Sequence, residues 1–496
     1  MSRNVTVLTI HRPVLSDHAV HFSWTTTPRS SLYRRESFSL RFPPGIDLRS
    51  VPSAFWDRAS LLLMHTHAAL LDPCTIEVPW SITEREATAL GQQVRAVKDT
   101  CDYYAGNEPN DATFRIYPSV TASAAGGTHR SSLRHDSAVA AFSGGRDGVV
   151  QAAMLRAAGV PLTLVTVTSA MPPSGDHANR WRRRSLATAP TRLDASFVEV
   201  RSDARSCSRV LWALENGRAA VGVHEVTDQI LYAVTCAAVA LAQGVGEVFL
   251  AAETETHFSI VVEGRVVQFQ QLSSAVPTLA TLQVLLDAFG LSLRCATAPF
   301  RSWQVSTFLA RKAPECIDLV ATCWRADAES RACNACSMCL SRTLFLLAEG
   351  IDERPIGVDL DRLGAWASEW EPDLSRLPDE SPRHMISRSN AEATLRAASK
   401  VSRSLPSSPI SRRAVESRKW KWVHDLNDRL EGDRIAPHIG WCRDLLWLGG
   451  PLVRTVSSQW GDALFGTGSA DGDLVAPSIR LAAEIRSGIA PPPVHR

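Results

Sequence analysis

Apolar and polar residues alternate near the start of the chain, which is typical of strands with one buried face. This pattern predicts strands over 5–10, 18–24 and 37–42. Helical spacing of apolar residues then predicts helices over 55–71 and 84–103, with a short strand at 75–78 between them. These segments indicate a mixed α+β unit over residues 1–135, whose last part, 121–135, is a predicted linker.

The middle of the chain alternates between strand-like and helix-like segments. The predicted strands are 138–142, 162–168, 197–200, 248–252 and 291–295. The predicted helices between them are 149–158, 230–242 and 279–289. This β–α order is typical of a doubly wound parallel sheet with right-handed crossovers, so an α/β domain is predicted over 136–350. In such sheets ligands bind at the carboxyl ends of the strands.

The last part of the chain, residues 351–496, is less regular. The stretch 382–421 is rich in Ser, Pro and Arg, which predicts a basic linker. Segments 420–430 and 441–448 are predicted to be helical, 475–489 is a predicted terminal helix, and the Pro-rich end 490–496 is predicted to be loose. We therefore expect a linker followed by a helical extension.

Composition narrows the class of protein. The 496 residues carry a net charge of only +2, which gives no argument for nucleic acid as the main partner. No secretory pattern opens the chain, and no apolar run approaches the roughly 18 residues of a membrane span. The 11 cysteines fit reduced thiols, so a cytoplasmic protein without a membrane partner is expected.

A glycine turn joins the first strand of the middle region to its helix. Its residues are Ser143, Gly144, Gly145, Arg146, Asp147 and Gly148. Glycines let backbone N–H groups approach a phosphate, and a helix N-terminus adds partial positive charge. The Ser143 hydroxyl can donate a hydrogen bond, and Asp147 can hold a phosphate-bound metal or cap the helix. The alternative is an ordinary glycine turn.

These six residues match neither the Walker pattern nor the dinucleotide-binding pattern. They resemble the PP-loop, Ser-Gly-Gly-x-Asp-Ser, of the N-type ATP pyrophosphatases. Members of that superfamily adenylate a carboxylate or carbonyl and release pyrophosphate. Gly148 departs from the pattern, because the family has a serine there, and this removes one hydroxyl donor.

Four cysteines, Cys323, Cys333, Cys336 and Cys339, cluster near the end of the same region. Four thiolates complete a closed tetrahedral zinc site, which leaves no open position for water and indicates a structural role. An iron–sulfur cluster is the main competing interpretation, and unrelated free thiols are the other.

The loop and the cluster together resemble 7-cyano-7-deazaguanine synthase, over about residues 137–348. In that family the cluster includes Ser-Cys and Cys-Gly-x-Cys; here Thr322 replaces the serine and Asn334 the glycine, while Arg342 matches. Val305 stands where the family has a lysine. The layout of the flanking regions is similar to that of the longer synthase-like proteins of bacterial anti-phage defence clusters of the Qat type.

The resemblance implies a reaction that uses ATP and Mg²⁺, with Zn²⁺ as a structural ion. Ser143 and Asp147 are the implied catalytic residues, and Ser143 to Gly148 the nucleotide-binding ones. A deazapurine-type carboxylate would be adenylated and passed to an amine, which a protein from the same defence cluster could supply. The alternatives are a non-catalytic scaffold with a degenerate loop, favoured by Gly148 and Val305, and a PP-loop enzyme that modifies tRNA.

Two charged segments lie at the predicted ligand-binding edge. The run Arg180–Arg184 is interpreted as a solvated basic turn, with a lid over phosphates as the alternative. Glu253 and Glu255 follow the fourth strand and are interpreted as part of a solvated loop, with contact between Glu253 and a purine or Mg²⁺ as the alternative.

Overall fold

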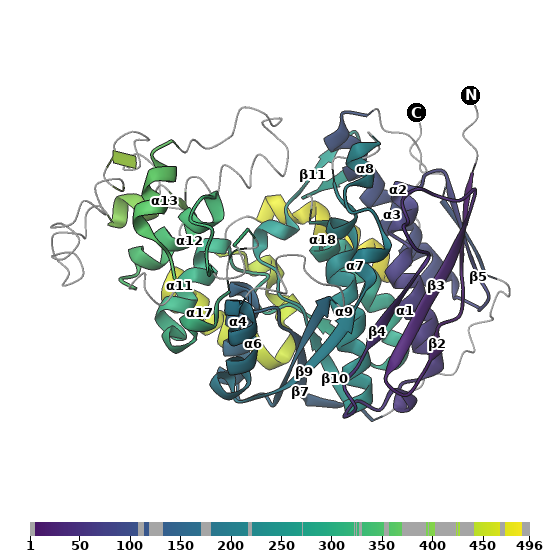
Figure 1. The fold of residues 1–496 in the computed structure, drawn as a ribbon, viewed down its shortest axis with the longest axis horizontal. Helices are drawn as coiled ribbons and strands as arrows, with labels where there is room; N and C mark the ends of the chain where they lie inside the picture. The colour runs from purple at the N-terminus through teal and green to yellow at the C-terminus, as the bar shows by residue number, and fades with distance from the viewer. Residues whose placement is uncertain are drawn as a thin grey trace.

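The centre of the molecule is a run of five parallel strands (Figure 1). They are β7 (Arg134–Ala141), β8 (Leu162–Ser169), β9 (Ala195–Ser202), β10 (Val245–Phe249) and β13 (Ser292–Arg294). Their spatial order is β13-β10-β7-β8-β9, so the chain reverses direction across the sheet between β7 and β10. The predicted α/β class with a mostly parallel central sheet is confirmed.

The computed structural model describes most, but not all, of the chain. The described residues are 5–107, 114–118, 132–169, 180–216, 221–269, 271–321, 323, 325–326, 330–351, 357–369, 393–394, 396–401, 423, 425–426, 441–466 and 472–488. Most of the predicted linkers 121–135 and 382–421, most of the predicted helix 420–430, and the tail 490–496 lie outside these residues.

Helices cover both faces of the parallel strands because successive strand residues point to opposite faces. On β7, Ala138 and Ala140 join a core with α4 (Arg146–Ala157) and α6 (Arg180–Leu193). Val139 and Ala141 join the other core, with α9 (Val223–Gln243) and α10 (Val276–Leu286). Strands buried on both faces read as near-continuous apolar runs, which is why the sequence marked them clearly.

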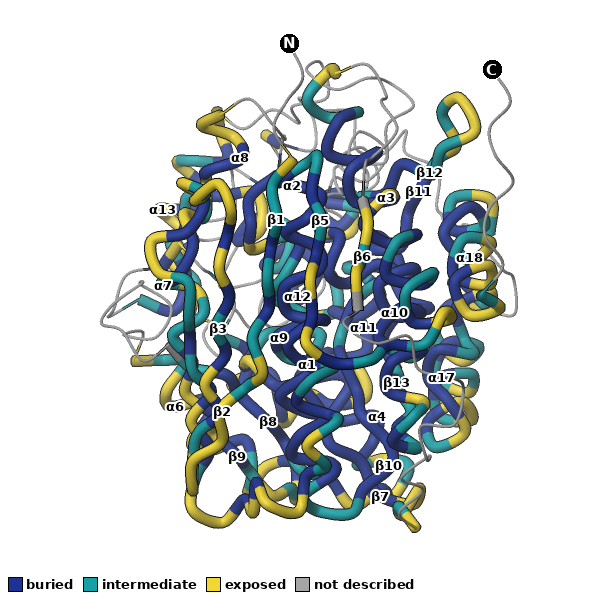
Figure 2. Tube along the Cα trace, turned by 90° about the vertical axis from the view of Figure 1, so that its right-hand side faces the viewer, coloured by how far each residue is buried: buried dark blue, intermediate teal, exposed yellow. Residues whose placement is uncertain are grey.

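The N-terminal strands extend this sheet. They are β1 (Thr6–Ile10), β2 (Val14–Leu15), β3 (Ala19–Thr27), β4 (Ser37–Arg41), β5 (Cys74–Val78) and β6 (Phe114–Pro118). β4 pairs antiparallel with β9, with Leu40 opposite Ser202, so one sheet of 11 strands runs through both regions. Helices α1 (Ser53–Met64), α2 (His67–Leu70) and α3 (Glu84–Ala105) pack in the same core as α9, and Figure 2 shows this continuous buried interior.

The later helices in the described part of the chain are α11 (Ser302–Lys312), α12 (Ser337–Ala348), α13 (Leu360–Ala367), α17 (Gly450–Phe465) and α18 (Gly472–Ser487). Most of them pack onto the central strands and their helices, whereas α13 packs on α12 in a separate apolar cluster. α17 contacts α4 on one side of the sheet, and α18 contacts α10 and α3 on the other. The described part of the extension therefore contributes to both cores.

One helix in the described part of the chain is long and apolar enough to cross a membrane, α9. In its most apolar window 67% of the residues are buried inside the fold, between the sheet and α1. Its hydropathy is accounted for by this central position in the core.

The basic run Arg180–Arg184 is not a turn, because it forms the first residues of α6. Arginine is a good helix former, and no glycine or proline interrupts these five residues. The guanidinium groups of Arg180 and Arg184 lie over the Trp181 ring, at 5.9 and 5.6 Å from its centroid.

Candidate functional site

The turn after β7 brings backbone, rather than side chains, to the carboxyl edge of the sheet. Ser143 is exposed, and Gly144 has a φ of +76°, a left-handed value that favours glycine. A Cβ at Gly144 would also lie 3.3 Å from the hydroxyl oxygen of Ser185 on α6. The glycine is therefore required both by conformation and by close packing.

Helix α4 begins at Arg146, directly after this turn. Gly145 is its N-cap and supplies no side-chain hydrogen bond, so the N–H groups of the first turn have no partner from a capping side chain. Uncapped N–H groups and the positive end of the helix dipole form a suitable site for phosphate oxygens. The nucleotide-binding role of Ser143 to Gly148 stays a prediction.

The turn lies where the strand order reverses. The segments after β7 and β10 leave the sheet side by side there, and in doubly wound folds this crevice is where ligands bind. Nη2 of Arg146, from the first segment, lies 2.5 Å from Oε2 of Glu253, from the second. The two chain segments are thus joined across the crevice by an ion pair.

Arg146 is buried, with 3% of its surface exposed, and it uses its guanidinium group within the protein. Nε donates to Asp147 Oδ1 at 2.9 Å, and Nη1 donates to the hydroxyl of Ser306 on α11 at 3.2 Å. Because Nη2 also donates to Glu253, all three guanidinium nitrogens form hydrogen bonds within the protein. The side chain of Arg146 is therefore engaged in contacts within the protein, and the nucleotide-binding role predicted for this residue stays a prediction.

Burial and neighbouring charges set the ionisation of the acids in this cluster. Burial by itself would raise the pKa of Asp147, but Arg146 and Arg342 outweigh it and lower that pKa. Burial and the charge of Asp147 raise the pKa of Glu253 well above its usual value. The directions of these two pKa shifts make Asp147 the stronger acid of the pair.

Glu255 lies on the 3₁₀ helix η2 (Thr254–His257), and its side chain contacts the first residue of α11. Both of its carboxylate oxygens accept the backbone N–H of Ser302 at 3.1 Å, and burial raises its pKa to about 7. The interpretation of Glu253 and Glu255 as a solvated loop is therefore wrong. Glu255 is 3% exposed and the side chain of Glu253 is 21% exposed, because α11 and α4 close over this segment.

The two positions that depart from the family pattern have different surroundings. Val305 is fully buried in the core on the α4 side of the sheet, so its side chain is part of the packing. At Gly148 a Cβ would meet Ala141 O at 3.7 Å and Phe142 Cδ2 at 3.8 Å, which is ordinary van der Waals contact. A Cβ atom therefore has room at residue 148.

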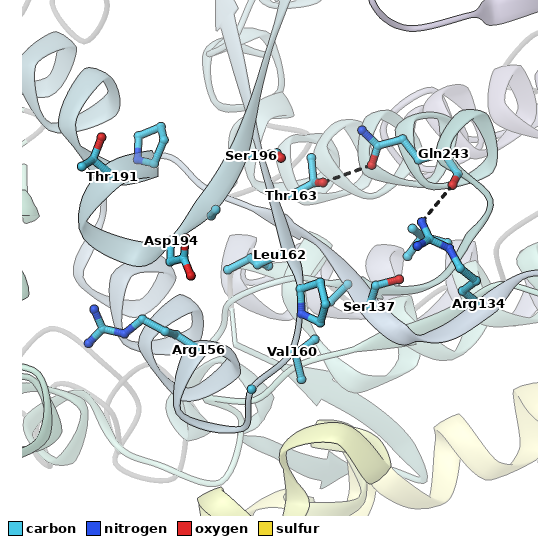
Figure 3. Close-up of a pocket in the computed structure, with 16 residues that line it drawn as sticks. Arg134, Ser137, Arg156, Val160, Leu162, Thr163, Thr191, Asp194, Ser196 and Gln243 are labelled. Carbon is cyan, nitrogen blue, oxygen red and sulfur yellow. Dashed lines mark hydrogen bonds between the residues drawn. The ribbon is translucent and has the colours of Figure 1, made fainter.

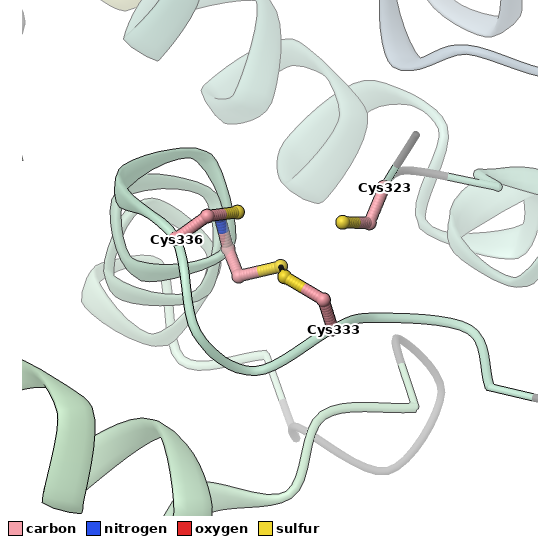
Figure 4. Close-up of side chains that lie close together, drawn as sticks. Cys323, Cys333 and Cys336 are labelled. Carbon is pink, nitrogen blue, oxygen red and sulfur yellow. Dashed lines mark hydrogen bonds between the residues drawn. The ribbon is translucent and has the colours of Figure 1, made fainter. Parts of the chain in front are cut away.

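The four predicted cysteine ligands converge. The sulfur atoms of Cys323, Cys333, Cys336 and Cys339 all lie within 4.8 Å of one another. The Sγ atoms of Cys333 and Cys339 are 3.8 Å apart, and Figure 4 shows the sulfurs directed toward a common centre. Four sulfurs at about 2.3 Å from a central ion would have this kind of spacing. The cluster can bind a metal ion such as zinc.

The loop that carries three of these cysteines depends on Asn334. Asn334 has a φ of +54°, a left-handed value that favours glycine, and asparagine is one of the few other residues that adopt it readily. Its side chain accepts the N–H of Asp359 at 3.1 Å and donates to Ala332 O at 3.2 Å. Cys336 caps α12, accepting the Cys339 N–H at 3.4 Å.

A cavity lies elsewhere in the described part of the chain, at the amino ends of the parallel strands (Figure 3). It has a volume of about 950 Å³, and its lining includes Arg134, Leu162, Thr163 and Ser196. None of the predicted site residues lines it. The carboxyl edge of the sheet is a better candidate for the functional site than this cavity, because backbone donors, charged groups and the strand reversal lie together there.

Sequence reasoning missed several residues that build the site. Ser306 and Ala321 contact the loop, and Ala321 donates its N–H to Gly144 O at 2.8 Å. Arg342 matches the family pattern, but its electrostatic effect on Asp147 comes only from the fold. No local pattern marks Ser306 or Ala321, since both act through long-range pairing with a loop more than 150 residues earlier in the chain.

No protein-family model, curated protein or solved structure matches this chain.

Proposed function

We propose that this chain is an ATP-dependent enzyme that adenylates a carboxylate and transfers the acyl group to an amine. The observation that carries the proposal is the uncapped N-terminus of α4 at the strand reversal, with the ionised carboxylate of Asp147 in its first turn. Phosphate groups and a divalent cation are the ligands that such a site favours.

In the proposed reaction, a substrate carboxylate oxygen attacks the α-phosphorus of ATP. The bond to pyrophosphate breaks and an acyl-adenylate forms. An amine nitrogen then attacks the acyl carbon, loses a proton, and releases AMP. The N–H groups of Gly145 and Arg146 and the hydroxyl of Ser143 would stabilise the charge on the departing pyrophosphate, and Asp147 would hold the phosphate-bound Mg²⁺. The ion supplies charge neutralisation at the phosphates.

The substrate class, the acceptor and the cellular role are carried by the family resemblance. We propose a 7-deazaguanine-type carboxylate as substrate and a protein of the same anti-phage defence system as the source of the amine, in a cytoplasmic setting. Zn²⁺ at the four cysteines would have a structural role, since a closed set of four thiolates leaves no position for substrate.

A non-catalytic scaffold is the second candidate, and specific observations favour it. Gly148 supplies no hydroxyl, and Val305 is buried in the core where a phosphate-binding lysine would be needed. A sulfur-transferring tRNA-modifying enzyme is less well supported. It needs a reactive cysteine outside the cluster, and the other seven cysteines are buried, with burial raising the pKa of Cys295 and Cys316 to about 11.

Pyrophosphate release from ATP tests the proposal. The purified protein should release pyrophosphate when supplied with 7-carboxy-7-deazaguanine and its partner proteins, and Asp147→Ala should lower the rate by a factor of about 100 or more. Ser143→Ala should lower it less, because the backbone donors remain. The matched control is Asp228→Ala on α9, an acid that pairs with Arg205 far along the chain from the loop. Turnover that survives Asp147→Ala would contradict the assigned site, and ATP binding without turnover would favour the scaffold.

A further inference from the structure

A short segment connects the cysteine cluster to the glycine turn. It consists of the 3₁₀ helix η5 (Pro314–Leu319) and the two residues after it, Val320 and Ala321. The N–H of Ala321 donates to Gly144 O at 2.8 Å. In a planar trans peptide the C=O and the next N–H point in opposite directions, so this hydrogen bond also fixes the direction of the Gly145 N–H.

Arg331 holds this segment from the side of the cluster. Its guanidinium group donates to three backbone carbonyls: Nη2 lies 2.6 Å from Asp318 O and 3.1 Å from Ile317 O, and Nε lies 3.2 Å from Val320 O. Arg331 is only 7% exposed. Its acceptors are therefore the last carbonyls before the residue that contacts Gly144.

Two features fix the position of Arg331 itself. It precedes the cluster residue Cys333 by two positions, so a metal that holds Cys333 also restricts the backbone of Arg331. On its other side the stem packs against Gly357, where a Cβ would lie 2.8 Å from Arg331 Cδ. The side chain thus has little freedom to release the carbonyls while the cysteine loop stays in place.

We propose that Arg331 is a positioning residue that couples the metal state of the cysteine cluster to the geometry of the phosphate-binding turn. The path runs from Cys333 to Arg331, then to the carbonyls of 317–320, and from Ala321 to Gly144. The phosphate role of the turn rests on the proposed function, whereas the mechanical coupling does not. Because coupling between two binding sites is reciprocal, a metal at the cluster and phosphates at the turn strengthen each other's binding.

A second arginine, Arg192, serves as the control for Arg331. Arg192 on α6 holds the same segment from the opposite side, donating to Glu315 O at 2.7 Å and pairing with Asp318 Oδ2 at 3.1 Å. It lies on an element far along the chain from the cysteines. Its loss should loosen the segment without removing the dependence on metal, whereas loss of Arg331 should remove that dependence.

Amide hydrogen exchange of the full-length, zinc-loaded protein tests the coupling directly. The reporters are the amides of Ala321 and Val149, which donate to Gly144 O and Gly145 O. Removing zinc with a chelator should speed their exchange roughly tenfold in the wild type, the effect of losing one to two hydrogen bonds. Peptides from β1 and β5 serve as the internal control and should not change.

The variants separate the proposal from a general loss of stability. Arg331→Gln should show fast exchange at Ala321 even with zinc bound, and zinc removal should add less than about twofold. Arg192→Gln should keep the full tenfold response to zinc. An unchanged Ala321 amide in zinc-free wild type, or a full response in Arg331→Gln, would overturn the proposal.

A second measurement decides the matter if zinc removal also unfolds the control peptides. MgATP should slow zinc release to a chromogenic chelator several-fold in the wild type and in Arg192→Gln, but not in Arg331→Gln. Equal slowing in all three proteins, or slowing in none although calorimetry shows that MgATP binds, would overturn the coupling. Calorimetric titration of MgATP into the wild type tests the proposed function independently of the coupling. If amide exchange depends on zinc but MgATP does not bind, the coupling is supported and the proposed function is contradicted.

Discussion

Arg146 and Glu253 form an ion pair, 2.5 Å between Nη2 and Oε2, that joins the first turn of α4 to the segment after β10. The pair lies where the strand order reverses, the place at which doubly wound sheets bind ligands. With Arg146 neutralised by acids, the positive charge offered to a phosphate comes mainly from the helix N-terminus. Asp147, which Arg146 and Arg342 keep ionised, remains at its edge.

The residue that replaces the expected serine gives a direct test of the turn. Gly148→Ser should be accommodated, because a Cβ there meets neighbours only at 3.7 Å and beyond. The new hydroxyl lies in the first turn of α4, so the affinity for MgATP should rise several-fold, about the value of one added hydrogen bond. Isothermal titration calorimetry measures the affinity.

Gly148→Ala is the matched control for this substitution. Both variants replace a helical glycine and should gain about 0.5–1 kcal/mol in the free energy of unfolding. Only the serine variant adds a hydrogen-bond donor. An equal change in ATP affinity for both variants would mean that the hydroxyl does not reach the phosphates.

Metal analysis tests the cysteine cluster. The protein should contain about one zinc per chain, and Cys336→Ser should remove most of it and lower the thermal stability, since zinc bound by four thiolates contributes to folding directly. Cys295→Ser, in a buried cysteine outside the cluster, should leave the zinc content unchanged. A coloured protein with iron and inorganic sulfide would replace the zinc assignment with an iron–sulfur cluster.

The sequence predicted the parallel strands and their helices well because the central strands, such as β10, are buried along their length and the turns are local. It did not predict that β4 pairs with β9, because antiparallel pairing between segments 160 residues apart leaves no local pattern. The environment of Glu253 and Glu255 was not predicted for the same reason. Two acids separated by one residue after a strand are typical of a solvated loop. Glu255 is buried through its contact with α11, a helix that follows much later in the chain.

The cysteine cluster, by contrast, could be predicted from the sequence. The spacing of the four cysteines predicted a metal site from the sequence, and the structure brings the four sulfur atoms together so that they could hold a metal ion. Asn334 could be read only as a departure from the family's glycine. Its φ of +54° explains the replacement, because both residues tolerate the same backbone conformation.

The pH dependence of stability should reveal Glu255. Burial raises its folded-state pKa to about 7 from an ordinary value of 4.5, so the folded state binds the proton more tightly than the unfolded state. Its contribution to stability is therefore present at low pH and is lost as the pH rises from about 4.5 to about 7. Urea unfolding of the wild type and of Glu255→Gln at several pH values measures this.

The difference in the free energy of unfolding between the wild type and Glu255→Gln isolates the titration of Glu255. His65, His67 and His257 are buried, and burial lowers the pKa of each, so their contribution to stability rises with pH below about 6.5 and opposes the trend of Glu255. These histidines are present in both proteins and cancel in the difference. The stability of wild type relative to Glu255→Gln should fall between pH 4.5 and 7 and then level off. A flat difference would show that Glu255 titrates normally.

Substitutions at Asn334 should separate backbone conformation from hydrogen bonding in the cysteine loop. Asn334→Ala loses the bonds to Asp359 N–H and Ala332 O and keeps an unfavourable positive φ, so it should lower the free energy of unfolding by about 2–3 kcal/mol. Asn334→Gly loses the same bonds but adopts this φ without strain, so it should recover about 1 kcal/mol of that loss. Urea unfolding of the zinc-loaded proteins gives these values, and zinc content shows whether the loop still holds the metal. Equal stability of the two variants would mean that the left-handed backbone at residue 334 carries no cost, and the replacement of the family's glycine would then be explained by the hydrogen bonds alone.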